Sequence, residues 1–83
     1  MNDQKILMDL VGWAGAATLL IAYLLVSSGK VSAKTILYQN LNIFGSFCLI
    51  INTYYYGTMS LVFLNSMWAL IGLYSLTALI RKS

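Results

Sequence analysis

The chain has 83 residues, of which 60% are hydrophobic and only 8% are charged, whereas ordinary soluble domains are about 25% charged. A soluble domain of this size leaves roughly 40% of its unfolded-chain surface in contact with water. Five basic and two acidic side chains cannot cover such a surface. The composition therefore argues against a soluble monomer and predicts a small integral membrane protein.

The same composition argues against most enzyme chemistry. The chain has no His, both of its acidic residues are Asp, and Cys48 is its single cysteine. Such a chain offers no ordinary acid–base pair, catalytic triad, His-based metal site or disulfide framework. Its net charge of +3 is too small and too localised for a nucleic-acid-binding surface. We expect no enzyme, no cofactor, no metal and no nucleic-acid partner.

The spacing of the charges predicts three membrane-spanning helices in a single transmembrane domain over 1–83. The charge-free segment 10–29 is long enough for one span of about 20 residues, and the segment 35–80 is long enough for two. We expect helices at 6–26, 35–55 and 60–80. Gly57 supplies the positive φ of a tight turn at 56–59, Gly29 ends the first helix, and Ser32 is the expected N-cap of the second.

The basic residues predict the orientation of these helices. With three spans, the 27–34 loop and the C-terminus share one side of the membrane. That side holds four of the five basic residues: Lys30, Lys34, Arg81 and Lys82. Because cytoplasmic loops are enriched in Lys and Arg, we expect the loop and the C-terminus in the cytoplasm and the N-terminus outside.

Polar and small residues recur on one stripe of each predicted helix, at spacings of three or four. In the second helix they are Tyr38, Asn42, Gly45, Leu49, Asn52 and Tyr56. In the third they are Asn65, Trp68, Gly72 and Ser75, and in the first Gly12, Gly15, Ala16, Thr18 and Ala22. Small residues allow helices to approach closely in a membrane.

Asn52 and Asn65 lie at similar depth, roughly 5–8 Å below the outer boundary. Two interpretations remain open for them: a solute pathway, or hydrogen bonds that only join helices. Trp68 is either a platform for a ring-shaped ligand or a packing residue. Gln39 is assigned to the cytoplasmic interface, and Cys48 is expected to behave as a small hydrophobe.

The stretch 38–80 resembles the second and third helices of the SemiSWEET and PQ-loop group of small transporters. The similarity rests on an aromatic residue after the inner loop, Gly45 in mid-helix, a short outer turn, and Asn65 early in the last helix. The resemblance implies an all-α triple-helix bundle that works as a parallel homodimer. It also implies a central cavity for a sugar or another small polar solute, with Asn65 as a binding residue.

The chain departs from this group in lacking the Pro-Gln motif, since it contains no proline. The group's pocket Trp falls on Leu49. The chain is more similar to a small bacterial branch of the superfamily, which implies a bacterial inner membrane. Three patterns carry that similarity: Gly-Trp-x-Gly at 12–15, Tyr-Gln-x-x-Asn at 38–42 and Leu-Asn-x-x-Trp at 64–68.

Our first hypothesis is a transporter protomer that works by alternating access without ion coupling. Asn65 and Asn52 would hydrogen-bond the solute, Trp68 would stack on it, and other residues would act in gating and packing. These other residues are Tyr54, Tyr56, Gly12, Gly15 and Gly45. The alternative is a non-transporting module that packs against a larger membrane enzyme or lipid-handling protein, with the same stripes as helix contacts.

Overall fold

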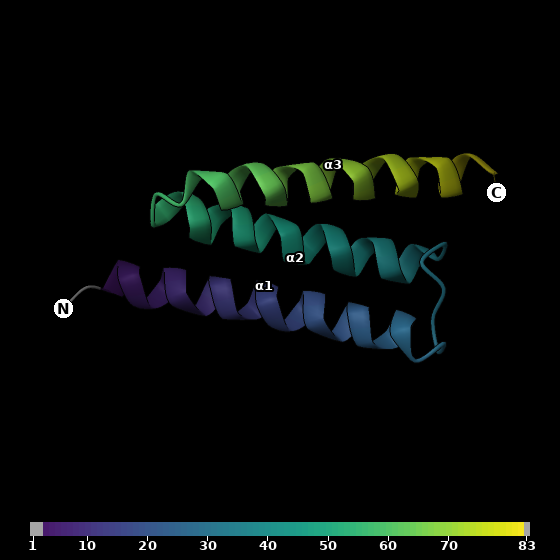
Figure 1. The fold of residues 1–83 in the computed structure, drawn as a ribbon, viewed down its shortest axis with the longest axis horizontal. Helices are drawn as coiled ribbons and strands as arrows, with labels where there is room; N and C mark the ends of the chain where they lie inside the picture. Colours follow the sequence, from purple (N-terminus) through teal and green to yellow (C-terminus); the bar gives the residue numbers. More distant parts are fainter. Residues whose placement is uncertain (1–2, 83) are drawn as a thin grey trace.

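A computed structural model describes residues 3–82 and contains three helices: α1 (Asp3–Ser27), α2 (Ile36–Tyr55) and α3 (Met59–Lys82). Successive helices run antiparallel, so the loop after α1 and the C-terminus lie at one end of the molecule (Figure 1). The N-terminus and the turn after α2 lie at the other end. The expected all-α class with three helices is confirmed.

Both helix-ending glycines adopt the backbone conformation expected from the sequence. Gly29 has φ +80° and Gly57 has φ +74°, in the left-handed region that glycine adopts without a Cβ penalty. After α1, the Lys30 N–H donates to the Leu25 carbonyl and the Gly29 N–H to the Val26 carbonyl, both at 3.1 Å. This pair of bonds is a Schellman motif, and the same pattern closes α2 around Gly57.

The expected N-cap of the second helix was wrong. Thr35, not Ser32, caps α2: its backbone is extended, and its hydroxyl accepts a hydrogen bond from the Tyr38 N–H at 3.3 Å. Ser32 lies one turn earlier, where its hydroxyl accepts from the Lys34 N–H at 3.0 Å. Ser32 therefore stabilises the loop, and the helix starts only after Thr35.

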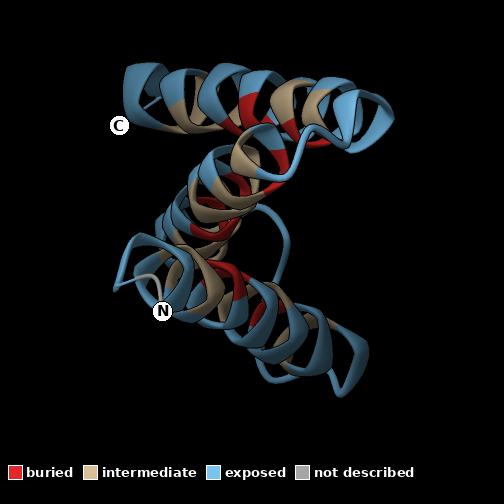
Figure 2. Cartoon of the chain, turned by 90° about the vertical axis from the view of Figure 1, so that its left-hand side faces the viewer, coloured by how far each residue is buried: buried red, intermediate tan, exposed pale blue. Residues whose placement is uncertain are grey.

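α2 lies between the other two helices and packs against both, whereas α1 and α3 do not pack against each other within residues 3–82. The view along the molecule shows this open arrangement (Figure 2). The three helices of the expected bundle are present, and within residues 3–82 they pack in the order α1, α2, α3 with α2 in the middle.

The interior of the molecule is small and polar, and its exterior is apolar. The buried residues follow the lines where α2 meets its neighbours (Figure 2). They are Gly12, Gly15, Ala22, Gln39, Gly45, Ser46, Thr53, Asn65, Ala69 and Gly72. Large apolar side chains cover the outside of all three helices. This distribution is the reverse of that in a soluble domain, where large apolar residues are the ones most often buried.

Two of the helices, α1 and α3, are long and apolar enough to cross a membrane by length and composition. α2 is less apolar on average and is not a candidate span by this criterion. The amide side chains of Gln39, Asn40, Asn42 and Asn52 interrupt its apolar sequence. Composition therefore supports two membrane-spanning helices of the three expected.

Candidate functional site

Glycines bring α1 and α2 into close contact near the middle of α1. A Cβ added to Gly15 would lie 2.7 Å from the Cys48 Cβ and 2.9 Å from the Gly45 carbonyl oxygen. A Cβ added to Gly45 would lie 2.7 Å from the Leu19 Cγ. Real Cβ atoms do not approach other atoms this closely, so the crossing requires glycine at both positions. Cys48, expected to behave as a small hydrophobe, is part of this contact.

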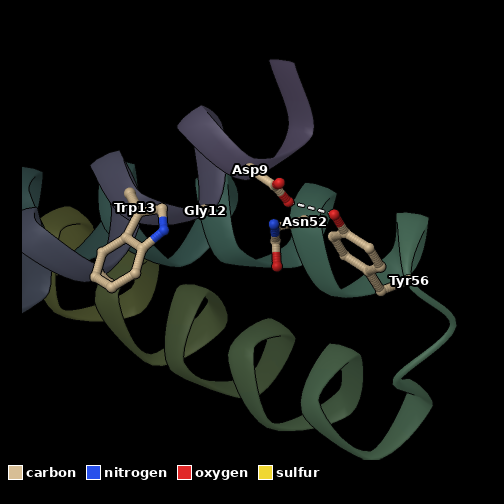
Figure 3. Close-up of a pocket in the computed structure, with 6 residues that line it drawn as sticks. Asp9, Gly12, Trp13, Asn52 and Tyr56 are labelled. Carbon is tan, nitrogen blue, oxygen red and sulfur yellow. Dashed lines mark hydrogen bonds between the residues drawn. The ribbon is translucent and has the colours of Figure 1, made fainter. Parts of the chain in front are cut away.

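A polar cluster joins the same two helices at the end that carries the N-terminus (Figure 3). The Asn52 side-chain amide donates to the Met8 carbonyl at 2.8 Å. The Tyr56 hydroxyl donates to the Asp9 carboxylate, and Lys5 forms an ion pair with Asp9 at 3.0 Å. The hydrogen bond to Asp9 raises the pKa of the Tyr56 hydroxyl. The cluster fixes α1 to the C-terminal end of α2.

Beside this cluster lies a shallow pocket of about 280 Å³, which we call the α1–α2 pocket. It is lined by Asp9, Gly12, Trp13, Ala16, Asn52 and Tyr56. Tyr56 and Asp9 are hydrogen-bonded to each other, the Asn52 amide is bonded to the Met8 carbonyl, and Trp13 is 74% exposed. The arrangement functions as a helix-joining contact with an aromatic rim.

All three helices contribute to a second cavity of about 350 Å³, which we call the central groove. Leu19 and Tyr23 come from α1, and Trp68 and Ile71 come from α3. Tyr38, Gln39 and Asn42 come from α2. Since α1 and α3 do not touch, α2 forms the floor of the groove and the other two helices form its walls. The groove combines two amides with three aromatic side chains.

Gln39 is the best-fixed polar side chain of the groove. It is only 7% exposed, and its side-chain N–H donates to the Ala33 carbonyl at 2.8 Å. Asn42 is held close to α3 by Gly72, since a Cβ added there would lie 2.8 Å from the Asn42 Nδ2. Gln39 was expected near the cytoplasmic interface, and its place in the groove was not predicted. Its spacing of three from Asn42 was the available signal.

The three predicted solute-binding residues lie in three different places in the single chain. Asn52 belongs to the α1–α2 pocket, and Trp68 lines the central groove with 42% of its surface exposed. Asn65 is 4% exposed, on the helix that packs only against α2. One chain does not bring these side chains into a common cavity, and their binding role stays a prediction.

The residues predicted for gating and packing also lie in different parts of the fold. Gly12, Gly15 and Gly45 lie where α1 meets α2, and Tyr56 lies in the α1–α2 pocket. Tyr54 is 68% exposed on the outside of α2. Within residues 3–82, no three His, Cys, Asp or Glu side chains cluster as metal ligands would.

The fold and the two cavities define a small three-helix protein with an apolar exterior and a polar groove between its helices. Residues 8–83 match the model of a protein family whose function is not known, and the chain belongs to that family. No curated protein and no solved structure matches the chain.

Proposed function

We propose that the chain is the protomer of a membrane transporter for a small neutral or zwitterionic polar solute, with the central groove as its half of the site. The observation that carries the proposal is the composition of the groove. It combines the Gln39 and Asn42 amides with the Trp68 indole in one lining, on helices whose outer surfaces carry large apolar side chains. Binding sites typically combine a mostly apolar wall with a few placed polar groups.

The chemistry of the groove favours an uncharged, hydroxyl-rich ring. Amides both donate and accept hydrogen bonds, and an indole face packs against a flat apolar ring surface. No charged side chain is among the described residues that line the groove. An ion with a net charge would therefore find no counter-charge there, and ion coupling is not required.

The position of α2 supports three membrane spans rather than two. α2 packs between α1 and α3 and runs antiparallel to both. If the two apolar outer helices cross the bilayer, α2 lies at the same depth. Gln39, which is only 7% exposed, is then shielded by its neighbours, whereas Asn42 stays partly exposed in the groove.

The charges at the two ends support one orientation in a bacterial inner membrane. The basic residues of the loop and of the end of α3 lie together, opposite Asp3, Lys5 and Asp9. By the positive-inside rule, this basic end faces the cytoplasm and the N-terminus faces outside.

A second copy of the chain completes the site in this proposal. The groove is open, since α1 and α3 leave it uncovered. A polar groove that faces lipid is unfavourable, and a partner helix surface would close it. The resemblance to SemiSWEET-type homodimers agrees with this arrangement.

The proposal is tested by uptake of radiolabelled sugars and zwitterionic amino acids into liposomes that contain the purified protein. Trp68→Ala and Asn42→Ala are expected to reduce uptake at least tenfold. Trp13→Ala is the matched control, because Trp13 is the other tryptophan and lies outside the groove, and it should leave uptake unchanged.

Equal loss in both tryptophan variants would contradict the assignment of the groove. No uptake of any solute would contradict transport itself. If, in addition, Asn65→Ala weakened the association of the chain into oligomers, the alternative function would be favoured: a non-transporting module that packs against a larger membrane protein.

A further inference from the structure

A third cavity lies at the basic end of the molecule, between the α1–α2 loop, the start of α2 and the end of α3. It measures about 350 Å³, and we call it the basic pocket. It is lined by Ala33, Lys34, Gln39, Tyr74, Ser75, Ala78, Leu79 and Lys82. Two ammonium groups from distant parts of the sequence thus meet at one cavity, beside the hydroxyls of Ser75 and Tyr74.

No acidic side chain balances these two lysines. The acidic residues of the chain, Asp3 and Asp9, are both in the first half of α1, at the opposite end of the molecule (Figure 1). The ion pair found among residues 3–82 is that of Lys5 with Asp9. The basic pocket therefore has an uncompensated positive charge, which favours an anionic ligand.

The pocket also lies at the depth of lipid headgroups. Lys34 precedes the first residue of α2 by two positions, and Lys82 is the last residue of α3. Helices of 25 and 24 residues are about 36–38 Å long, which exceeds a hydrocarbon core of about 30 Å. Their ends consequently reach the phosphate layer.

The walls of the pocket distinguish a lipid from a free anion. Ala33, Ala78 and Leu79 form an apolar wall next to the lysines. Tyr74 is 78% exposed beside them, an amphipathic side chain of the kind that favours the membrane interface. A free phosphate ion makes no favourable contact with an apolar wall, whereas the glycerol and first methylenes of a phospholipid pack against it.

We propose that the basic pocket binds an anionic phospholipid, with its phosphate between Lys34 and Lys82 and its acyl chains against Ala78 and Leu79. Basic pockets between transmembrane helices on the cytoplasmic side are suited to such headgroups. The proposal requires that the protein is embedded in a membrane. It does not require that the protein transports a solute.

The test is native mass spectrometry of the detergent-solubilised protein, titrated with phosphatidylglycerol or phosphatidylcholine of the same acyl chains. Phosphatidylglycerol should bind more tightly than phosphatidylcholine. Lys34→Gln and Lys82→Gln should each lower the affinity for phosphatidylglycerol about fivefold. Lys30→Gln and Arg81→Gln are matched controls, because they remove the same charge at the same end outside the pocket lining. Both should retain wild-type affinity.

A variant that keeps every charge provides a second arm. Ala78→Leu places a larger side chain in the pocket lining and should weaken the binding of phosphatidylglycerol as well. Circular dichroism checks that the helix content is unchanged. Equal losses in all four charge variants would show general surface attraction and overturn the proposal. Equal affinity for both lipids would overturn it too. Displacement of the lipid by millimolar inorganic phosphate or glycerol phosphate would identify a free-anion site instead.

Discussion

Replacing Gly15 with alanine tests the close crossing of α1 and α2. A Cβ there would lie 2.9 Å from the Gly45 carbonyl oxygen and 2.7 Å from the Cys48 Cβ. Neither atom belongs to the far end of a flexible side chain, so the two helices must move apart. Their separation would also loosen the contact of Gly45 with Leu19.

The magnitude follows from two opposing effects. Overpacking a tight contact destabilises by about 1–3 kcal/mol, while alanine in place of glycine favours a helix by about 1 kcal/mol. The net expectation for Gly15→Ala is a free energy of unfolding lower by up to about 2 kcal/mol.

Gly12→Ala is the internal comparison. The nearest atom to a Cβ added there is the Asn52 Nδ2, on a side chain that can rotate away. That rotation breaks the hydrogen bond to Met8, worth about 1 kcal/mol. The gain in helix propensity offsets this loss, so stability should change little.

Unfolding in mixed micelles of dodecyl maltoside and SDS, followed by circular dichroism, measures both variants. Ala17→Leu, on the exposed side of the same turn, controls for general effects of a larger side chain. If Gly15→Ala proved more stable than wild type, the close crossing would be incorrect.

Three further predictions use the same unfolding assay. Ser46 is fully buried and its hydroxyl has no hydrogen-bond partner among residues 3–82, so Ser46→Ala should raise stability by about 1 kcal/mol. Thr53→Val removes a hydroxyl that donates to the Leu49 carbonyl at 2.6 Å and should lower stability. If Ser46→Ala and Thr53→Val changed stability equally, the difference in hydrogen bonding between the two hydroxyls would be contradicted. Asn52→Ala should lower stability by about 1 kcal/mol and speed amide hydrogen exchange in the first turns of α1; unchanged exchange there would count against the bond to Met8. Gly29→Ala places alanine at φ +80° in open space and should lower stability by about 1–2 kcal/mol, and a neutral result would argue against the Schellman turn.

The elements that local chemistry controls were predictable from the sequence. The C-terminal ends of α1 and α2 depend on the two glycines, which need no tertiary contact to favour left-handed backbone, whereas α1 starts at Asp3 and α3 ends at Lys82, beyond the charge-free segments. The N-cap was misplaced because Ser32 and Thr35 are both good capping residues. The choice between them depends on how the loop packs.

The face-to-face pairing of the helices could not be predicted in the same way. A single polar stripe on α2 was assumed to face a single site, but α2 has two neighbours and needs two interface stripes. Ile43 and Gln39 lie against Gly72 of α3, together with the Asn42 amide from the first stripe. Ser46 and Thr53 continue that second stripe at helical spacing. The second stripe is harder to recognise in the sequence, because it contains hydroxyl residues and one glutamine, whereas the first stripe contains asparagines.

The middle position of α2 also explains why the predicted trio of site residues is dispersed. Asn52 uses the side of α2 that faces α1, whereas Asn65 packs from the side of α3. Two residues predicted to lie at equal depth therefore do not meet when one of them faces α1 and the other lies on α3. The central groove keeps the Gln39 and Asn42 amides at an open surface, because α1 and α3 do not pack against each other. Closure of that groove from lipid requires a surface that a single chain does not supply, and this requirement makes the second copy part of the proposed site.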